Sequence, residues 1–249
     1  MTLHQRELAW EGLLNVRDLG GHSTEDGGET KYGRVIRADS VRGLTDAGWE
    51  ALVDYGVRTI IDLRTDKELA ADPPLELPVD VAHVAIVEED ADVFAQVDKA
   101  ADDAVNSSMG TRDVYLIFLE RFKANFARAV AEIGHAPEGG VVVHCAGGKD
   151  RTGLVTALLL RLAGVDAEAV AADYALSEER LRPRHDLWLA EAATEAERER
   201  IRRIAVTPPD AMAEVLEELE RRYGSIEGYL RAGGLSNEDL ARVRSRLRD

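Results

Sequence analysis

The sequence predicts an α/β protein in which a mainly parallel central sheet is flanked by helices and the C-terminal half is rich in helices. Short apolar runs alternate with helical patterns over the first 145 residues, which indicates crossover connections between parallel strands. Helical patterns dominate afterwards. The 249 residues are 45% hydrophobic, contain no repeat or long linker, and can bury one large core, so we expect a single domain over residues 1–249.

Four short apolar runs are predicted to be strands, and several have the pattern of strands that are buried on both faces. They are Arg34–Arg37, Val57–Leu63, Val81–Val87 and Val141–His144. Between the strands, Leu44–Tyr55 has helical periodicity with Thr45 as its N-cap, and Arg112–Ile133 has the same periodicity. This alternation is typical of a parallel sheet.

Residues 88–112 break the alternation of strands and helices. They are acidic, rich in alanine and aspartate, and weakly patterned. We interpret them as an excursion that covers a site, and a disordered surface insertion is an equally weighted alternative.

The remainder of the chain is predicted to form a layer of helices on the sheet. These helices are Thr152–Ala163, Asp166–Leu176, Glu178–Ala192, a stretch before Thr207, Pro208–Tyr223, Ser225–Leu230 and Ser236–Leu247.

The composition excludes several classes of protein. A formal charge of −16 argues against nucleic acid or an anionic membrane as a broad partner, because a polyanion needs an extended basic field. A local group of arginines could still bind a phosphate. Cys145 is the only cysteine, which excludes an intramolecular disulfide and a multi-cysteine zinc site. Without a signal-like N-terminus or an apolar run of spanning length, we expect a cytoplasmic protein, with export by another route left open.

The run HCAGGKDRTG, which we call the cysteine loop (His144–Gly153), carries the strongest chemical signal. It follows a predicted strand and precedes a predicted helix. A thiolate is the reactive form of cysteine, and its pKa falls at a helix N-terminus or beside cations. Gly147 and Gly148 can adopt backbone conformations that are closed to other residues, so that successive N–H groups converge on an anion. The sequence therefore predicts a phosphate site that faces Cys145 as nucleophile.

Other side chains of the cysteine loop have separate expected uses. Arg151 can fold back and bind two phosphate oxygens with its planar guanidinium. Thr152 can cap the following helix and hydrogen-bond the sulfur. His144 can orient the loop. The residues expected to contact the phosphate are Ala146, Gly147, Gly148, Lys149, Asp150, Arg151 and Thr152.

The cysteine loop resembles the signature of the protein-tyrosine phosphatase superfamily, and specifically that of the atypical bacterial tyrosine/serine phosphatases. Other segments of this chain resemble recurring segments of that family over almost its whole length. They are Asn15–Gly21, Arg37–Leu44, Ile61–Glu68, Ala172–Leu176 and Tyr223–Leu230.

This resemblance implies a protein-tyrosine-phosphatase-like fold and a two-step hydrolysis through a phosphocysteine, without a metal or an organic cofactor. Substrates would be phosphotyrosine in a protein and, in some members, phosphoserine, phosphothreonine or phosphoinositides. Some members carry a helical lid, which would correspond by position to residues 88–112. The resemblance does not indicate an oligomeric state.

The general acid is the least determined part of the predicted site. No tryptophan is followed by proline, so the Trp-Pro-Asp loop of classical tyrosine phosphatases is missing. The resemblance assigns the acid role to Asp150, although its neighbour Arg151 favours the charged form of the carboxyl. Asp62, at the end of a buried strand, and Asp113 are the alternatives, and a supporting structural role is the favoured interpretation for both.

Further basic residues have two open interpretations. Lys149 could bind a second phosphate or steer the substrate, or it could be a solvated lysine. Arg17, Arg37 and Arg64 could enlarge a positive region around the phosphate, or they could form salt bridges elsewhere.

Two other functions compete with a phosphatase. An inactive phosphate-binding module would keep the loop, yet nothing required for turnover is missing from it. A redox or sulfur-transfer enzyme could share the order of strand, cysteine, loop and helix, but it would lack a resolving cysteine.

Overall fold

The chain folds around a five-stranded sheet, and the computed structural model describes residues 6–72 and 77–248. The strands are β1 (Arg17–Asp18), β2 (Val35–Ala38), β3 (Val57–Asp62), β4 (Asp80–His83) and β5 (Gly140–His144). Their order across the sheet is β1-β2-β5-β3-β4. Only β1 runs antiparallel to its neighbour, which confirms the predicted mainly parallel sheet in an α/β fold.

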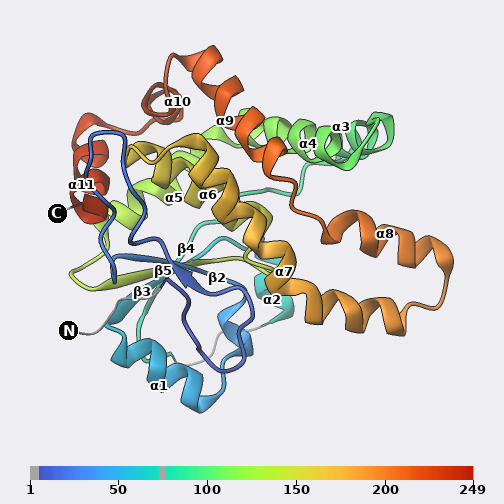
Figure 1. Cartoon of the computed structure of the whole chain (residues 1–249), viewed down its shortest axis with the longest axis horizontal. Coiled ribbons are helices and arrows are strands. Elements are labelled where there is room, and N and C mark those ends of the chain that lie inside the picture. Colours follow the sequence, from blue (N-terminus) through green and yellow to red (C-terminus); the bar gives the residue numbers. More distant parts are fainter. Residues whose placement is uncertain (1–5, 73–76, 249) are drawn as a thin grey trace.

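Helices cover both faces of the sheet but in unequal numbers. The α-helices in the described part of the chain are α1 (Asp46–Asp54), α2 (Asp66–Ala71), α3 (Ala91–Asp103), α4 (Ser107–Arg121), α5 (Lys123–His135), α6 (Asp150–Leu162), α7 (Ala167–Glu191), α8 (Glu195–Ala205), α9 (Pro209–Tyr223), α10 (Ile226–Ala232) and α11 (Asn237–Arg248). Figure 1 shows α1 below the sheet, whereas α5, α6 and the C-terminal helices lie above it. The helix-rich C-terminal half therefore forms most of one layer.

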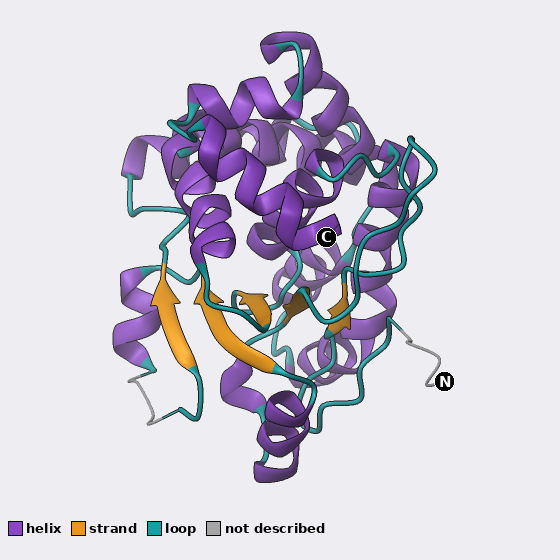
Figure 2. Ribbon diagram, turned by 90° about the vertical axis from the view of Figure 1, so that its left-hand side faces the viewer, coloured by secondary structure: helices purple, strands orange, loops and turns teal. Residues whose placement is uncertain are grey.

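Strand β5 illustrates why the central strands are apolar at every position. Val141 and Val143 belong to the large core under the C-terminal helices, whereas Val142 belongs to a smaller core with Trp10 and Leu52. Successive side chains of a strand point to opposite faces, so a strand with helices on both sides needs apolar residues throughout. Figure 2 shows these helices on either side of the strands.

The carboxyl ends of the parallel strands meet at one edge of the sheet. His144 at the end of β5 is in register with Ala38 of β2 and Asp62 of β3. Cys145 follows directly. Ligands of parallel sheets bind outside this edge, so the strand register alone places Cys145 and Asp62 at the edge of the sheet where a substrate is expected.

Two predicted strand and helix boundaries in the first half are wrong. The predicted strand Val81–Val87 pairs only over β4, and Val84 and Val87 are apolar because they are buried in the large core as irregular chain. The predicted helix Arg112–Ile133 is two helices, since Phe122 leaves the helical conformation with φ −111° and ψ 25° and packs in the core between α4 and α5. Neither β1 nor α2 was predicted.

In the second half, α7 is one continuous helix where two helices were predicted. Ser177, at the expected break, is fully buried in the helix and accepts hydrogen bonds from two arginines. Pro183 also lies inside α7. The predicted break at Ser177 is therefore wrong, because tertiary contacts hold this residue inside one helix.

Residues 88–112 are mostly helical and do not form a disordered insertion. They contain α3 and the first residues of α4, and N-caps at Asp90 and Asn106 begin these helices. Separately, no helix in residues 6–72 and 77–248 is long and apolar enough to cross a membrane.

Candidate active site

The cysteine loop joins β5 to α6 at the carboxyl edge of the sheet. Cys145 is 3% exposed. Helix α6 begins at Asp150, two residues before the predicted start at Thr152. The positive end of the α6 dipole therefore lies at the loop, where it favours an anion.

The carbonyl groups of the cysteine loop are held away from its concave side. Ala146 O accepts a hydrogen bond from Ser40 N at 3.1 Å, and Gly147 O accepts one from Asn15 Nδ2 at 3.1 Å. Gly148 O accepts two, from Asn15 Nδ2 at 3.0 Å and from Arg37 Nη2 at 2.8 Å. Within the described residues, the N–H groups of residues 146–149 have no acceptor. These N–H groups are the donors that an oxyanion would use.

Only one of the two loop glycines needs to be glycine. Gly148 has φ +63°, and an added Cβ would lie 2.3 Å from Ala38 O. Gly147 is not in the left-handed region, and an added Cβ there would have no neighbour closer than 4.0 Å. The prediction of special backbone geometry is therefore confirmed at Gly148 and wrong at Gly147.

A buried ionic network supports the two anchors of the loop. Asp173 on α7 pairs with Arg17 at 3.1 Å and with Arg37 at 2.8 Å. Arg17 Nη1 donates to Asn15 Oδ1 at 2.7 Å, which directs the amide nitrogen of Asn15 toward the loop. Burial alone would raise the pKa of Asp173, but the arginines outweigh it and keep that pKa well below its ordinary value. Of the two interpretations of Arg17 and Arg37, the structure therefore favours salt bridges over a positive region that faces a substrate.

Arg151 is oriented by a carboxylate from α2. Its two terminal nitrogens bind the two oxygens of Glu68, with Nη2–Oε1 at 2.8 Å. Glu68 is itself fixed because its carboxylate also accepts from Thr65 N at 2.8 Å. Burial opposes ionisation of Glu68, yet the hydrogen bonds from Arg151 and Thr65 lower its pKa to about 2. An ionised Glu68 therefore holds the guanidinium in one plane.

Thr152 and His144 differ in part from their predicted contacts. Thr152 lies inside α6 and does not cap it, and its buried hydroxyl has no partner in residues 6–72 and 77–248, neither the Cys145 sulfur nor another group. His144 Nδ1 lies 3.2 Å from Cys145 O. Because a carbonyl only accepts, this nitrogen carries the proton. Burial lowers the pKa of His144, so its ring is neutral.

Asp62 and Arg64 pair with each other beside His144. Asp62 accepts from Arg64 Nε at 3.0 Å and from Nη2 at 2.7 Å, and Arg64 also reaches Asp72 at 2.8 Å. Although burial opposes ionisation, the hydrogen bonds from Arg64 lower the pKa of Asp62. This arrangement is that of a supporting ion pair.

Asp150 lies at the mouth of the site with one of its oxygens fixed. Tyr115 Oη donates to Asp150 Oδ1 at 2.5 Å, and the Tyr115 and Tyr174 hydroxyls lie 2.8 Å apart. Burial raises the pKa of Tyr115 well above its ordinary value, so this hydroxyl remains a donor. Asp150 Oδ2 has no hydrogen-bond partner in the described part of the chain, and the residue lines a pocket.

Lys149 and Asp113 are both engaged by other groups of the protein. Lys149 Nζ donates to the carbonyls of Ile204 and Val206, with the second at 3.4 Å, and so joins the cysteine loop to the end of α8. Asp113 pairs with Arg112 at 2.8 Å and is not among the residues that line the pocket beside Asp150.

Four residues of the site have roles that sequence reasoning missed. They are Asn15, Glu68, Tyr115 and Asp173. Asn15, Glu68 and Asp173 fall in the segments that carried the family resemblance. Their position in those segments was a signal, but each acts on a residue more than 80 positions away.

The comparisons with known proteins agree with this geometry. The sequence matches the tyrosine phosphatase family over residues 8–249. It is 29% identical to the triple specificity protein phosphatase PtpB of Mycobacterium tuberculosis, covering 97% of this chain and 98% of that protein. It is 30% identical to a tyrosine-protein phosphatase of Nostoc commune, covering 85% of this chain and 73% of that protein. The predicted family is confirmed: the chain is a member of the tyrosine phosphatase family.

Proposed function

We propose that this phosphatase hydrolyses phosphotyrosine in a protein or peptide through Cys145, with Arg151 and the N–H groups of the cysteine loop holding the phosphoryl group. The observation that carries the proposal is the set of loop N–H groups that have no acceptor within residues 6–72 and 77–248, next to the only cysteine of the sequence and to the fixed guanidinium of Arg151. Such an arrangement stabilises charge on the three non-bridging oxygens of the transferring phosphoryl group.

The reaction follows from these positions in two balanced steps. The Cys145 thiolate forms a bond to phosphorus while the bond to the tyrosyl oxygen breaks, and Asp150 supplies the proton that the leaving oxygen needs. Water then attacks the phosphocysteine and gives its proton to Asp150, which returns the thiolate and releases phosphate. The hydroxyl of Thr152, which has no partner in the part of the chain that the structure describes, is available to the sulfur in the second step.

The activity is tested by measuring release of inorganic phosphate from phosphotyrosyl, phosphoseryl and phosphoinositide substrates. We expect turnover of phosphotyrosine that persists in EDTA and is inhibited by vanadate, an analogue of the pentacoordinate phosphoryl group. The name of the Mycobacterium relative supports including all three substrate classes. Binding of phosphate with no turnover of any substrate would instead indicate an inactive binding module.

A second prediction concerns Asp150 as the acid. Asp150→Asn should lower kcat about 100-fold for phenyl phosphate, whose leaving group needs a proton, and less than about 10-fold for p-nitrophenyl phosphate. Tyr115→Phe removes the hydrogen bond that orients Oδ1 and should give a smaller loss with the same dependence on the leaving group. Equal losses with both substrates would assign Asp150 a structural role.

The proposal also includes a lid over the site, a reducing compartment and a protein substrate. Residues 88–112 supply α3 and the start of α4, which line the pocket beside Asp150, so this segment is proposed to cover the site as a lid. The lone cysteine supports a reducing compartment such as the cytoplasm. The negative charge supports a protein substrate over nucleic acid.

A further inference from the structure

The pocket that contains Asp150 and Arg151 extends well beyond the space that a phosphotyrosine ring needs. Its volume is about 940 Å³, and it continues from the cysteine loop between α3, α4 and α8. Pockets of this size hold whole ligands of several rings. The space beyond the ring is therefore available to another part of the substrate.

The wall of this extension that α3 and α4 form is largely apolar. Its apolar residues include Phe94, Val97, Ala101, Val114 and Phe118. The first three are spaced so that they follow one face of α3, and the last two are one turn apart on α4. Phe94 is 39% exposed, which leaves much of its ring without a protein neighbour. An apolar ligand group would remove this surface from water.

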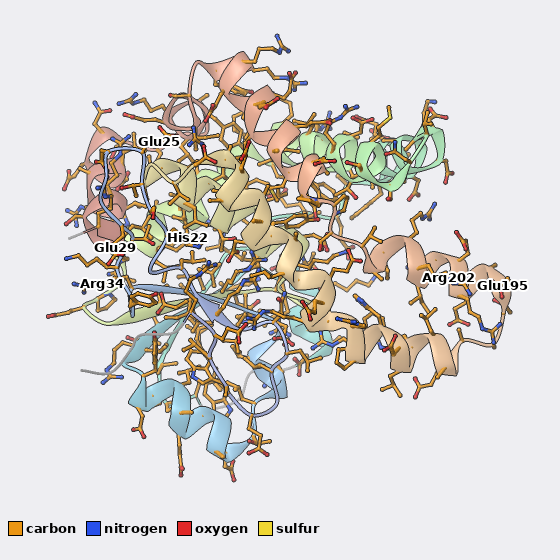
Figure 3. All side chains as sticks on the ribbon, in the orientation of Figure 1. His22, Glu25, Glu29, Arg34, Glu195 and Arg202 are labelled. Carbon is orange, nitrogen blue, oxygen red and sulfur yellow. The ribbon has the colours of Figure 1, made fainter. Side chains whose placement is uncertain are left out.

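The opposite wall, from α8, does not provide a polyanion site. Figure 3 shows Arg202 and Glu195 together on α8, where they pair at 2.7 Å. Arg203 pairs with Asp102 of α3 at 3.4 Å. Arg200 is the one pocket arginine of α8 without an ion pair among the described residues. The whole chain carries a charge of −16, which opposes an anionic lipid surface.

We propose that the pocket between α3, α4 and α8 is a subsite for an apolar side chain next to phosphotyrosine in a peptide substrate. This inference rests on the proposed phosphotyrosine phosphatase activity and names the substrate class within it. Asp150 and Arg151 line this pocket together with Phe94 and follow Cys145 in the cysteine loop. The proposal therefore places the phosphoryl group at Cys145 and a neighbouring side chain against Phe94.

The test compares phosphotyrosine peptides that differ only in the residues flanking phosphotyrosine, either leucine or serine. For the wild-type protein we expect kcat/KM to be about 10-fold higher for the leucine peptide, mainly through KM. Phe94→Ser should reduce this preference to about 3-fold or less, because its loss of kcat/KM falls mainly on the leucine peptide. Phe94→Leu, which keeps an apolar side chain, should retain the preference.

Val105→Ser is the matched control, because Val105 follows α3, is 84% exposed and does not line the pocket. It should keep the full preference for leucine.

Equal kcat/KM for the two peptides in the wild type, with p-nitrophenyl phosphate turned over, would overturn the subsite and leave the phosphatase proposal intact. No turnover of any phosphomonoester would refute the proposed function itself. If Phe94→Ser lowers turnover only of phosphatidylinositol phosphate in vesicles, and not of the peptides, the pocket holds a lipid chain and the peptide subsite is overturned.

Discussion

Replacing Cys145 by serine is expected to lower kcat for p-nitrophenyl phosphate by on the order of 10⁴-fold or more. The serine hydroxyl is a far weaker nucleophile than a thiolate, because a hydroxyl stays almost wholly protonated at neutral pH whereas a thiol beside cations and a helix N-terminus ionises readily. Steady-state assays with the purified variant measure this loss.

The Cys145→Ser variant also separates chemistry from binding. The N–H groups of the cysteine loop are unchanged, so inorganic phosphate should still bind with an affinity within about 10-fold of the wild type by calorimetry. Thermal unfolding shows whether the buried hydroxyl harms the fold, and Cys145→Ala provides a second variant without it. Undiminished turnover in both folded variants would refute the cysteine mechanism.

Replacing Arg151 by lysine should cost about 10³-fold in kcat/KM, although the charge is kept. The guanidinium can bind Glu68 with two nitrogens and present its remaining edge to phosphate oxygens, whereas an ammonium group cannot do both. A lysine at this position would pair with Glu68 and leave the transition-state charge less neutralised. Kinetics with p-nitrophenyl phosphate measure the effect.

Arg161→Lys is the matched control for this change. Arg161 lies on the same helix, α6, and also binds a carboxylate with two nitrogens, that of Glu220 at 2.8 and 3.0 Å. It lies outside the site, so its replacement should leave kcat/KM unchanged. Comparable losses in the two variants would show that α6 is sensitive to any such change and that Arg151 has no special role.

The sequence predicts the chemistry of this protein better than it predicts the contacts that support the site. Val141–His144 predicts a buried strand, and the cysteine, glycines and arginine that follow it predict an anion site, because all of these signals are local. The helix α6 that completes the site is also local, and its predicted start differs by only two residues.

Contacts between distant segments could not be predicted in the same way. Glu68 is 83 positions from Arg151, and Asp173 is 136 positions from Arg37. The sequence around an acidic residue on a helix does not identify the distant residue with which it pairs. The continuity of α7 through Ser177 has the same origin, since two arginines from the sheet side bind that hydroxyl.

Because Asn15 and Arg37 anchor the cysteine loop, the sequence of the loop alone cannot reproduce this anion site. The amide and guanidinium that turn the loop carbonyls outward come from segments more than 100 positions earlier in the chain. A ten-residue peptide with the sequence of the loop, or the same residues transplanted onto another strand and helix, would lack these donors. Its carbonyls would be free to rotate inward and meet the anion. A working anion site therefore needs the loop together with Asn15, Arg37 and the carboxylate of Asp173. The fold brings these residues together, and no short continuous segment of the sequence contains them all.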